Sequence, residues 1–183
     1  MSWATPPRRV AGDAEILSLK GQTLYNLSRF AESVASLSKA VEADPENVDT
    51  YYFLARTQRA AGEAEAAMAT FDRAIARHPD LAWLYLEKGH TVGSAQTEEA
   101  VLAAAPIYGA ALVAKQLDPT TRTDATNAIW GILGTREKFA EAEALCSAWA
   151  EAHPDDAYAY WWEGFYRTRQ KRDEDALESF AKS

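Results

Sequence analysis

A short pattern returns along this chain after about 34 residues, and then again after slightly more than twice that interval. A period of this size indicates a repeat architecture. Each copy begins with Asp or His followed by Pro, continues through a short polar step and a group of aromatic residues, and closes on a small residue. The copies read DPENVDTYYFLA, HPDLAWLYLEKG and HPDDAYAYWWEG. Repeats of this length are typical of stacked supersecondary units, each of which buries its apolar face against its neighbours. The chain is therefore expected to fold as an array of repeats.

The prolines and the small residues keep the same spacing. The interval from Pro45 to Pro79 equals the interval from Gly21 to Ala55 and the interval from Ala55 to Gly89. Because Pro cannot continue a helix, we expect each such Pro to separate one repeat from the next.

Within one repeat the apolar positions follow the period of a helix. Tyr51, Leu54 and Ala55 fall on one helical face, and Ala67 and Phe71 share another after a break at AAGEAE. The pattern predicts an all-α fold in which each repeat is a pair of antiparallel helices, with small residues allowing the two helices to approach closely.

Two repeats depart from the pattern. The third carries six extra residues, and Thr97 is expected to cap a second helix that runs to about Leu117. Pro106 should kink this helix or split it after Ala105, because Pro removes one backbone donor. The fourth repeat has a degenerate first helix and carries Trp149 where a small residue is usual.

Composition narrows the classes of partner. The formal net charge is −8, with acidic and basic residues mixed throughout, which argues against nucleic acid or an anionic membrane as a partner because both need a concentrated basic patch. The first ten residues lack the apolar stretch of a signal peptide, and no apolar run approaches the roughly 20 residues that cross a bilayer. With Cys146 as the only cysteine, we expect a reducing compartment and a cytoplasmic location.

The repeat pattern resembles the tetratricopeptide repeat (TPR) family over about residues 14–183. The residues that carry the resemblance are Leu17, Gly21, Leu24, Ser33, Leu37, Ala40 and Pro45, then Tyr51, Leu54, Ala55, Ala67, Phe71, Ala74 and Pro79, and finally Tyr160, Gly164, Ala176 and Phe180. The resemblance implies a right-handed superhelical solenoid of about five antiparallel helix pairs. The expected division is a flexible segment at 1–13 and repeats at 14–47, 48–81, 82–121, 122–156 and 157–183, the last one truncated.

No combination of residues predicts catalysis, a cofactor or a metal site. His78 and His153 precede repeat prolines, where a helix-end His interacts with the helix dipole. His90 has no companion ligands, and a lone His does not make a metal site. Cys146 occupies the position of Phe71, so we expect a buried structural thiol and not a nucleophile.

The candidate partner-binding surface is the face of the first helices that points away from the core of each helix pair. The resemblance implies that this face lines a concave groove, and its residues here are Tyr52, Phe53, Arg56, Arg59, Trp83, Glu87, His90, Trp161, Trp162, Phe165 and Arg169. Aromatic and Arg side chains are the usual anchors of interfaces. Glu87 would repel a C-terminal carboxylate, so the sequence favours an apolar or aromatic-bearing peptide or helix. The alternative is that some of these rings pack between neighbouring helix pairs.

Three hypotheses about function follow. The first is a non-catalytic scaffold that binds a peptide or helix of a partner protein in the groove. The second is an N-terminal regulatory or substrate-recruiting TPR domain of a longer enzyme. The third is self-association through the C-terminal end, since the final helix stops mid-repeat at Ser183 and terminal repeats need a solvating cap. For the same reason we expect either a frayed last helix or a longer parent chain.

Overall fold

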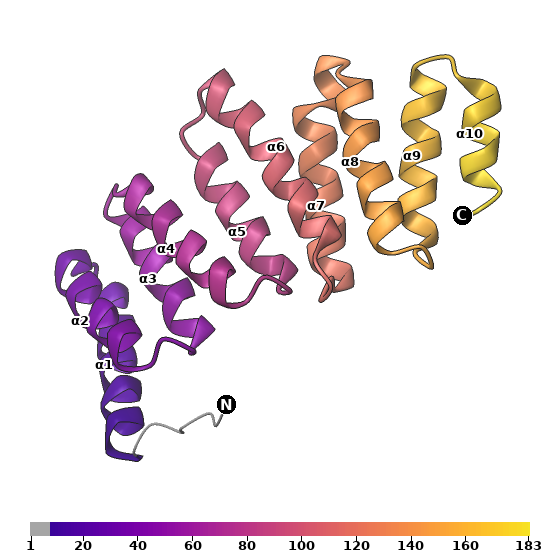
Figure 1. Cartoon of the computed structure of the whole chain (residues 1–183). Coiled ribbons are helices and arrows are strands. Elements are labelled where there is room, and N and C mark those ends of the chain that lie inside the picture. The colour runs from indigo at the N-terminus through magenta and orange to yellow at the C-terminus, as the bar shows by residue number, and fades with distance from the viewer. Residues whose placement is uncertain (1–7) are drawn as a thin grey trace. The chain divides into compact units, whose positions relative to one another are not determined.

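The computed structural model describes residues 8–183, with side chains from Gly12 onward. Figure 1 shows helices following one another in chain order. Within the described residues the only pairing of β type is an isolated bridge between Leu81 and Gln116. The prediction of an all-α repeat fold is confirmed.

The helices follow one another as five successive pairs. Their bounds are α1 (Arg8–Asn26), α2 (Phe30–Ala43), α3 (Val48–Ala60), α4 (Ala64–Arg77), α5 (Ala82–Gly93), α6 (Glu98–Val113), α7 (Pro119–Ile132), the 3₁₀ turn η1 (Gly134–Arg136), α8 (Phe139–Ala152), α9 (Ala157–Arg169) and α10 (Asp173–Phe180). Of the segment 1–13, expected to be flexible, residues 1–7 lie outside the described residues, and α1 already begins at Arg8.

The chain divides into two compact units. The N-terminal unit (residues 1–78) holds α1 to α4, and the C-terminal unit (residues 79–183) holds α5 to α10. Each is described by itself below.

The turn inside each helix pair has the same backbone geometry. One residue per turn has a positive φ, and these residues are Ser28, Gly62, Gln96, Glu137 and Lys171. They are equally spaced along the chain, except that the step from Gln96 to Glu137 is longer than the others. A left-handed residue commonly ends a helix by satisfying its last carbonyl groups. The regular spacing shows that the repeat survives in every pair, and the long step places the insertion between the third turn and the fourth.

Close approach of paired helices depends on glycines of the first helix. An added Cβ would lie 2.4 Å from the Leu37 side chain at Gly21, 2.6 Å from Tyr108 at Gly89 and 2.7 Å from Phe180 at Gly164. Leu37 and Phe180 each follow their glycine at the same interval along the chain. That interval, counted from Gly89, ends nearly one helical turn before Tyr108. The insertion therefore places a different residue of α6 against α5.

The insertion does not lengthen α6 as far as expected. Thr97 caps the helix by accepting a bond from the Ala100 N–H, as predicted. The helix continues without a split through Pro106, whose ring is solvent-exposed, and it ends at Val113. Of the two outcomes expected at Pro106, a kink or a split after Ala105, the split is therefore wrong.

The predicted end near Leu117 was also wrong. Residues 114–118 instead form an extended connection beside the start of α5. There the Gln116 N–H donates to the Asp80 carbonyl at 2.8 Å, and the Ala82 N–H donates to the Gln116 carbonyl at 3.4 Å. These bonds satisfy backbone groups that would have been paired inside a longer helix.

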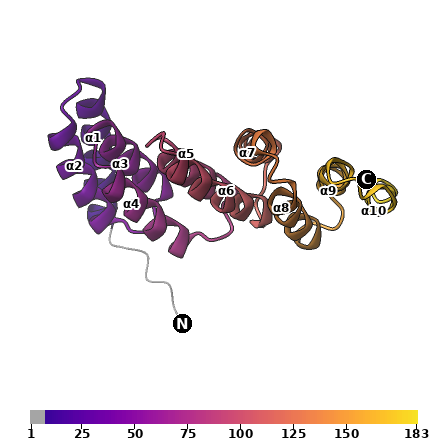
Figure 2. The same cartoon turned by 90° about the horizontal axis from the view of Figure 1, so that it is seen from above.

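The fourth pair is built differently from the others. Trp130 of α7 precedes Gly164 by one repeat interval, so it takes the position that Gly21, Ala55 and Gly89 hold in the other pairs. Trp149 of α8 is fully buried where α2 and α4 carry the small Ala40 and Ala74. A Trp at the position where the other pairs keep a small residue is incompatible with close backbone packing, and Figure 2 shows α7 set apart from α8.

Polar caps fix where several of these helices begin. The Asn47 side chain accepts from the Thr50 N–H at the start of α3, and Asp156 accepts from the Tyr158 N–H at the start of α9. Asp118 accepts from the N–H groups of two residues in the first turn of α7, each at 3.0 Å. These caps satisfy donors that have no partner inside the helix.

Candidate partner-binding surface

Helix α9 carries four of the predicted site residues on one side. Trp161 and Phe165 are four residues apart, which brings side chains together on a helix. Their rings are stacked, with centroids 5.6 Å apart and an angle of 10° between the planes. Trp162 meets Phe165 edge to face at 5.5 Å. Arg169 lies one turn further on, with its guanidinium 5.8 Å from the Phe165 ring centre. The structure therefore brings these four predicted residues together.

Two residues from other helices complete the cluster. Trp130 of α7 meets the Phe165 ring at 5.3 Å. The Arg169 guanidinium lies 5.9 Å from the Trp130 ring centre and 5.5 Å from that of Phe139, the first residue of α8. We call this set the α9 aromatic surface; its members are Trp130, Phe139, Trp161, Trp162, Phe165 and Arg169.

The members differ in how far they are buried. Trp162 and Phe165 are half-buried and pack against the core of the C-terminal unit, as do Trp130 and Phe139. Trp161 is 44% exposed and Arg169 is exposed. The expectation that some of the rings pack between helix pairs thus describes Trp162 and Phe165, while Trp161 and Arg169 face solvent above them.

A hollow adjoins the exposed indole. It has a volume of ≈ 270 Å³ and is lined by Ala157, Tyr158, Trp161 and Ser183. Tyr158 is 55% exposed, and the Arg122 guanidinium lies 4.8 Å from its ring centre. The hollow is large enough for one apolar side chain and has aromatic walls on two sides.

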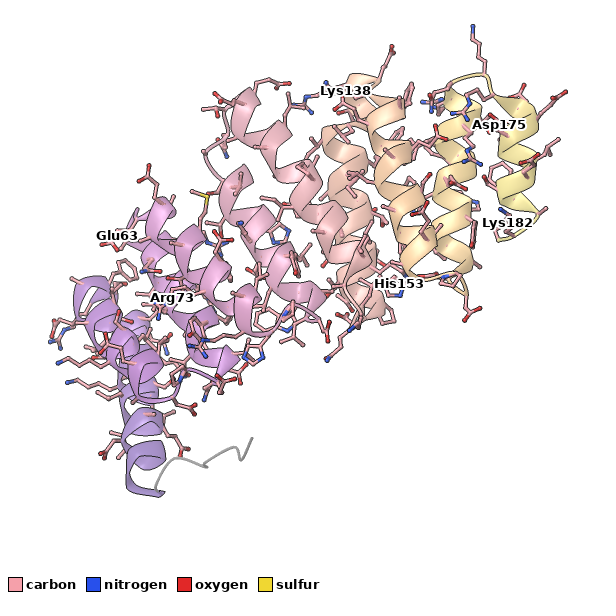
Figure 3. The ribbon with its side chains drawn as sticks, in the orientation of Figure 1. Glu63, Arg73, Lys138, His153, Asp175 and Lys182 are labelled. Carbon is pink, nitrogen blue, oxygen red and sulfur yellow. The ribbon has the colours of Figure 1, made fainter. Side chains whose placement is uncertain are left out.

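A buried ionic network holds α9 in place beneath this surface. Arg167 donates to Glu143 of α8 at 2.8 Å and to Glu163 of α9 at 3.0 Å, and both carboxylates are buried. Arg167 also donates to the Ser179 hydroxyl of α10 at 2.6 Å. Charged hydrogen bonds of this kind fix geometry, so the network sets the position of α9 against both neighbours. Figure 3 shows Lys138, just before α8, and Asp175 of α10 near the same end of this unit.

Of the site residues of α5, only His90 lines a second hollow in the C-terminal unit; Trp83 and Glu87 are not part of its lining. It measures ≈ 410 Å³, and its lining includes His90 and Tyr108. The two rings meet at 5.6 Å. Burial and the nearby Glu87 carboxylate raise the pKa of Tyr108 to about 12. Trp83 and Glu87 are half-buried and His90 is exposed. This hollow can accommodate an apolar group, but Glu87 disfavours an anion.

The site residues of α3 belong to the N-terminal unit. Tyr52 and Phe53 meet edge to face at 5.5 Å. The Arg56 guanidinium lies 4.9 Å from the Tyr25 ring centre, and hydrogen bonding to Tyr25 raises the pKa of Arg56. These three residues and Arg59 are half-buried, so each keeps part of its surface in solvent.

Outside these surfaces, we searched the described residues for a reactive thiol, a metal site and a membrane-spanning helix. Cys146 is 1% exposed and burial raises the pKa of its thiol, so the prediction of a buried thiol is confirmed. Among residues 12–183, no three His, Cys, Asp or Glu side chains are grouped closely enough to hold a metal ion. In the described part of the chain, no helix is both long and apolar enough to cross a membrane.

Sequence reasoning missed Trp130 and Phe139 as members of the surface. A signal for Trp130 exists, because counting back one repeat interval from Gly164 reaches this Trp at a position where the repeat demands a small residue. A large ring at such a position must point away from its paired helix, and here it packs against α9. No comparable signal marks Phe139.

The family model described as tetratricopeptide repeat matches residues 24–89. No curated protein sequence gives a significant match. A crystal structure of the MamA protein is similar at 19% identity, covering 93% of this chain and 89% of that one with a TM-score of 0.57. The structure of YrrB, described as a TPR protein with an unusual peptide-binding site, has 21% identity, coverage of 93% and 84%, and a TM-score of 0.53. PilF of Pseudomonas aeruginosa has 14% identity, coverage of 95% and 78%, and a TM-score of 0.56.

At these identities the structural likeness shows the fold alone. The fold and its repeated turns define a helical-repeat protein. The family model identifies residues 24–89 as tetratricopeptide repeats, and the same helix-pair repeat continues through the rest of the described residues. It has the general architecture of a scaffold for protein–protein interaction.

Proposed function

We propose that this chain is a non-catalytic, cytoplasmic scaffold and that its α9 aromatic surface binds a peptide or helix of a partner protein. The bound segment carries an apolar or aromatic side chain that packs on Trp161 and enters the hollow beside it. The predicted residues of α5 and, in the N-terminal unit, those of α3 offer separate contacts of the same kind.

One observation carries the proposal. Trp161 exposes 44% of a large flat side chain while it is held in place by stacking on the half-buried Phe165. A rigid, pre-positioned aromatic ring is the usual anchor of an interface because it loses little conformational entropy on binding. The peptide-binding site described for YrrB, which has a similar fold, supports the same kind of activity here.

The test uses a library of displayed peptides selected on the immobilised chain. Replacing Trp161 by Ala should cost about 2 kcal/mol or more of binding free energy for the selected peptides. The melting temperature of the Trp161→Ala variant should stay near that of the wild type, since Trp161 faces solvent. Leu177→Ala is the matched control, because Leu177 is 69% exposed on α10 outside the surface. Equal capture by wild type and Trp161→Ala would contradict the proposal.

Self-association is a second candidate, favoured by the exposure of Leu177 on α10. An exposed apolar residue on a terminal helix can pack against a second copy. Light scattering at several concentrations should then show a rise in apparent mass that Leu177→Glu abolishes. A constant monomeric mass in both proteins would exclude this candidate.

A further inference from the structure

Arg169 is the charged member of the α9 aromatic surface, and within residues 12–183 no carboxylate forms an ion pair with it. Its neighbours differ: Arg167 pairs with Glu143 and Glu163, and Arg172 pairs with Glu143 and Asp175. Arg122, at the opposite end of α9, pairs with Asp156 at 3.2 Å. The surface therefore has one end whose positive charge is already neutralised and one end, at Arg169, where it is not.

The surrounding rings position the Arg169 guanidinium without using up its donors. It lies 5.5 to 5.9 Å from three ring centres. Contacts of this kind are electrostatic attractions to the ring faces, and they leave the fork of N–H groups free to bond an anion. A carboxylate can accept two parallel hydrogen bonds from such a fork. The exposed Arg169 is thus a pre-positioned receptor for one carboxylate.

The distance between the two features sets the spacing of the ligand. Trp161 and Arg169 are eight residues apart on α9, which is about 12 Å along a helix at 1.5 Å per residue. An extended segment advances about 3.3 Å per residue and covers this distance in three or four residues. Flat aromatic surfaces suit extended segments, as in the recognition of polyproline-type peptides.

We propose that the α9 aromatic surface selects an extended partner segment in which Asp or Glu lies three or four residues from a bulky apolar residue. The side-chain carboxylate pairs with Arg169, and the apolar side chain occupies the hollow beside Trp161. This inference rests on the proposed function and adds the charge and the spacing of the ligand. The net charge of −8 makes the selection local, because the chain as a whole repels an acidic segment.

The test is a selection from a library of short random peptides displayed with their C-termini fused, so that every available peptide carboxylate is a side chain. The selection is run on the full chain in three forms: the wild type, Arg169→Glu and Trp161→Ala. Lys39→Glu, an exposed residue of α2, is the control for the same change of charge. Wild type and Lys39→Glu should enrich Asp or Glu three or four positions from an aromatic or aliphatic residue. Arg169→Glu should lose this acidic preference.

A second measurement begins with the wild-type chain alone. The peptide that the wild type enriches most is synthesised with its acidic residue as Glu and as Gln, and both are titrated against wild type by fluorescence anisotropy. The Gln peptide should bind about tenfold more weakly, the usual loss of one hydrogen-bonded charge pair. Arg169→Gln should then bind both peptides with the same affinity.

The outcomes separate the two proposals. Enrichment of apolar peptides without acidic preference, equal affinity of the Glu and Gln peptides, or a spacing near eight residues would overturn this inference while the proposed function stands. If wild type enriches no peptides that Trp161→Ala loses, both fall.

Discussion

At the scale of single residues, a few glycines decide how close the paired helices come. A Cβ at position 89 would lie 2.6 Å from the Tyr108 ring, which is closer than real contacts allow. Gly89→Ala should therefore lower the free energy of unfolding by about 1–3 kcal/mol through overpacking. Urea unfolding followed by circular dichroism measures this change.

Gly131→Ala is the matched control for that substitution. Gly131 also lies in a helix, but an added Cβ there meets nothing within 4 Å. Alanine is the better helix former, so this variant should gain roughly 0.5–1 kcal/mol. If both variants shift the free energy of unfolding in the same direction, close packing at Gly89 does not explain the effect of the Gly89→Ala substitution.

A second residue-scale prediction concerns the cap of α7. Hydrogen bonds from Thr121 to Asp118 hold the pKa of that carboxyl below its ordinary value of about 3.9. A lowered folded-state pKa stabilises the fold fully above the ordinary pKa, and this stabilisation is lost as the pH falls through the folded-state pKa. Asp118→Ala should cost about 1 kcal/mol at pH 7 and progressively less as the pH falls below 4. A cost that stays constant to pH 2 would contradict the role of the charge; urea titrations at each pH decide this.

At the scale of elements, the second helices of four pairs were predictable, while α6 and the first helix of the fourth pair were not. Ser33, Ala67, Ala142 and Ala176 share one repeat position, and each is at most 2% exposed. The repeat pattern exists because paired helices approach closely and tolerate only small residues there. In α7 this position holds Trp130, and α7 does not approach its paired helix closely. The requirement for a small residue, which generates the repeat pattern, is therefore absent there.

The site shows the same limit. Helical periodicity placed Trp161, Trp162, Phe165 and Arg169 on one face of α9, and the structure brings them together. The approach of α7 to α9 depends on side chains that meet across separate helix pairs, which a period within one helix does not encode. Trp130 and Phe139 therefore emerge only from the fold.

The element-scale prediction concerns the network that ties α10 to α9. Arg167 neutralises two buried carboxylates and also donates to the Asp175 carbonyl in α10. Arg167→Met leaves the buried Glu163 without a cation, while Glu143 keeps Arg172, and should cost about 3 kcal/mol. We expect hydrogen exchange in the wild type to be faster in α10 than in α4, and the substitution should accelerate it most in α10. Arg29→Met removes an exposed ion pair with Glu32 and should change stability by less than about 1 kcal/mol. Equal effects of the two substitutions would mean that the network does not anchor α10.

At the scale of the whole molecule, a repeat protein transmits stability mainly between neighbouring pairs, because each repeat packs against the next one only. The division into units at residues 1–78 and 79–183 should make this locality visible in the full chain. Gly21→Ala forces a Cβ to within 2.4 Å of the Leu37 side chain, and so it strains the α1–α2 pair. Hydrogen exchange should then accelerate in α1 and α2, less in α3 and α4, and not in α7 to α10. Gly164→Ala, which crowds Phe180, should produce the reverse pattern, with faster exchange in α9 and α10. A uniform acceleration of all helices by either substitution would show that the chain unfolds as one cooperative body, and the α9 aromatic surface would then depend on the N-terminal unit for its stability.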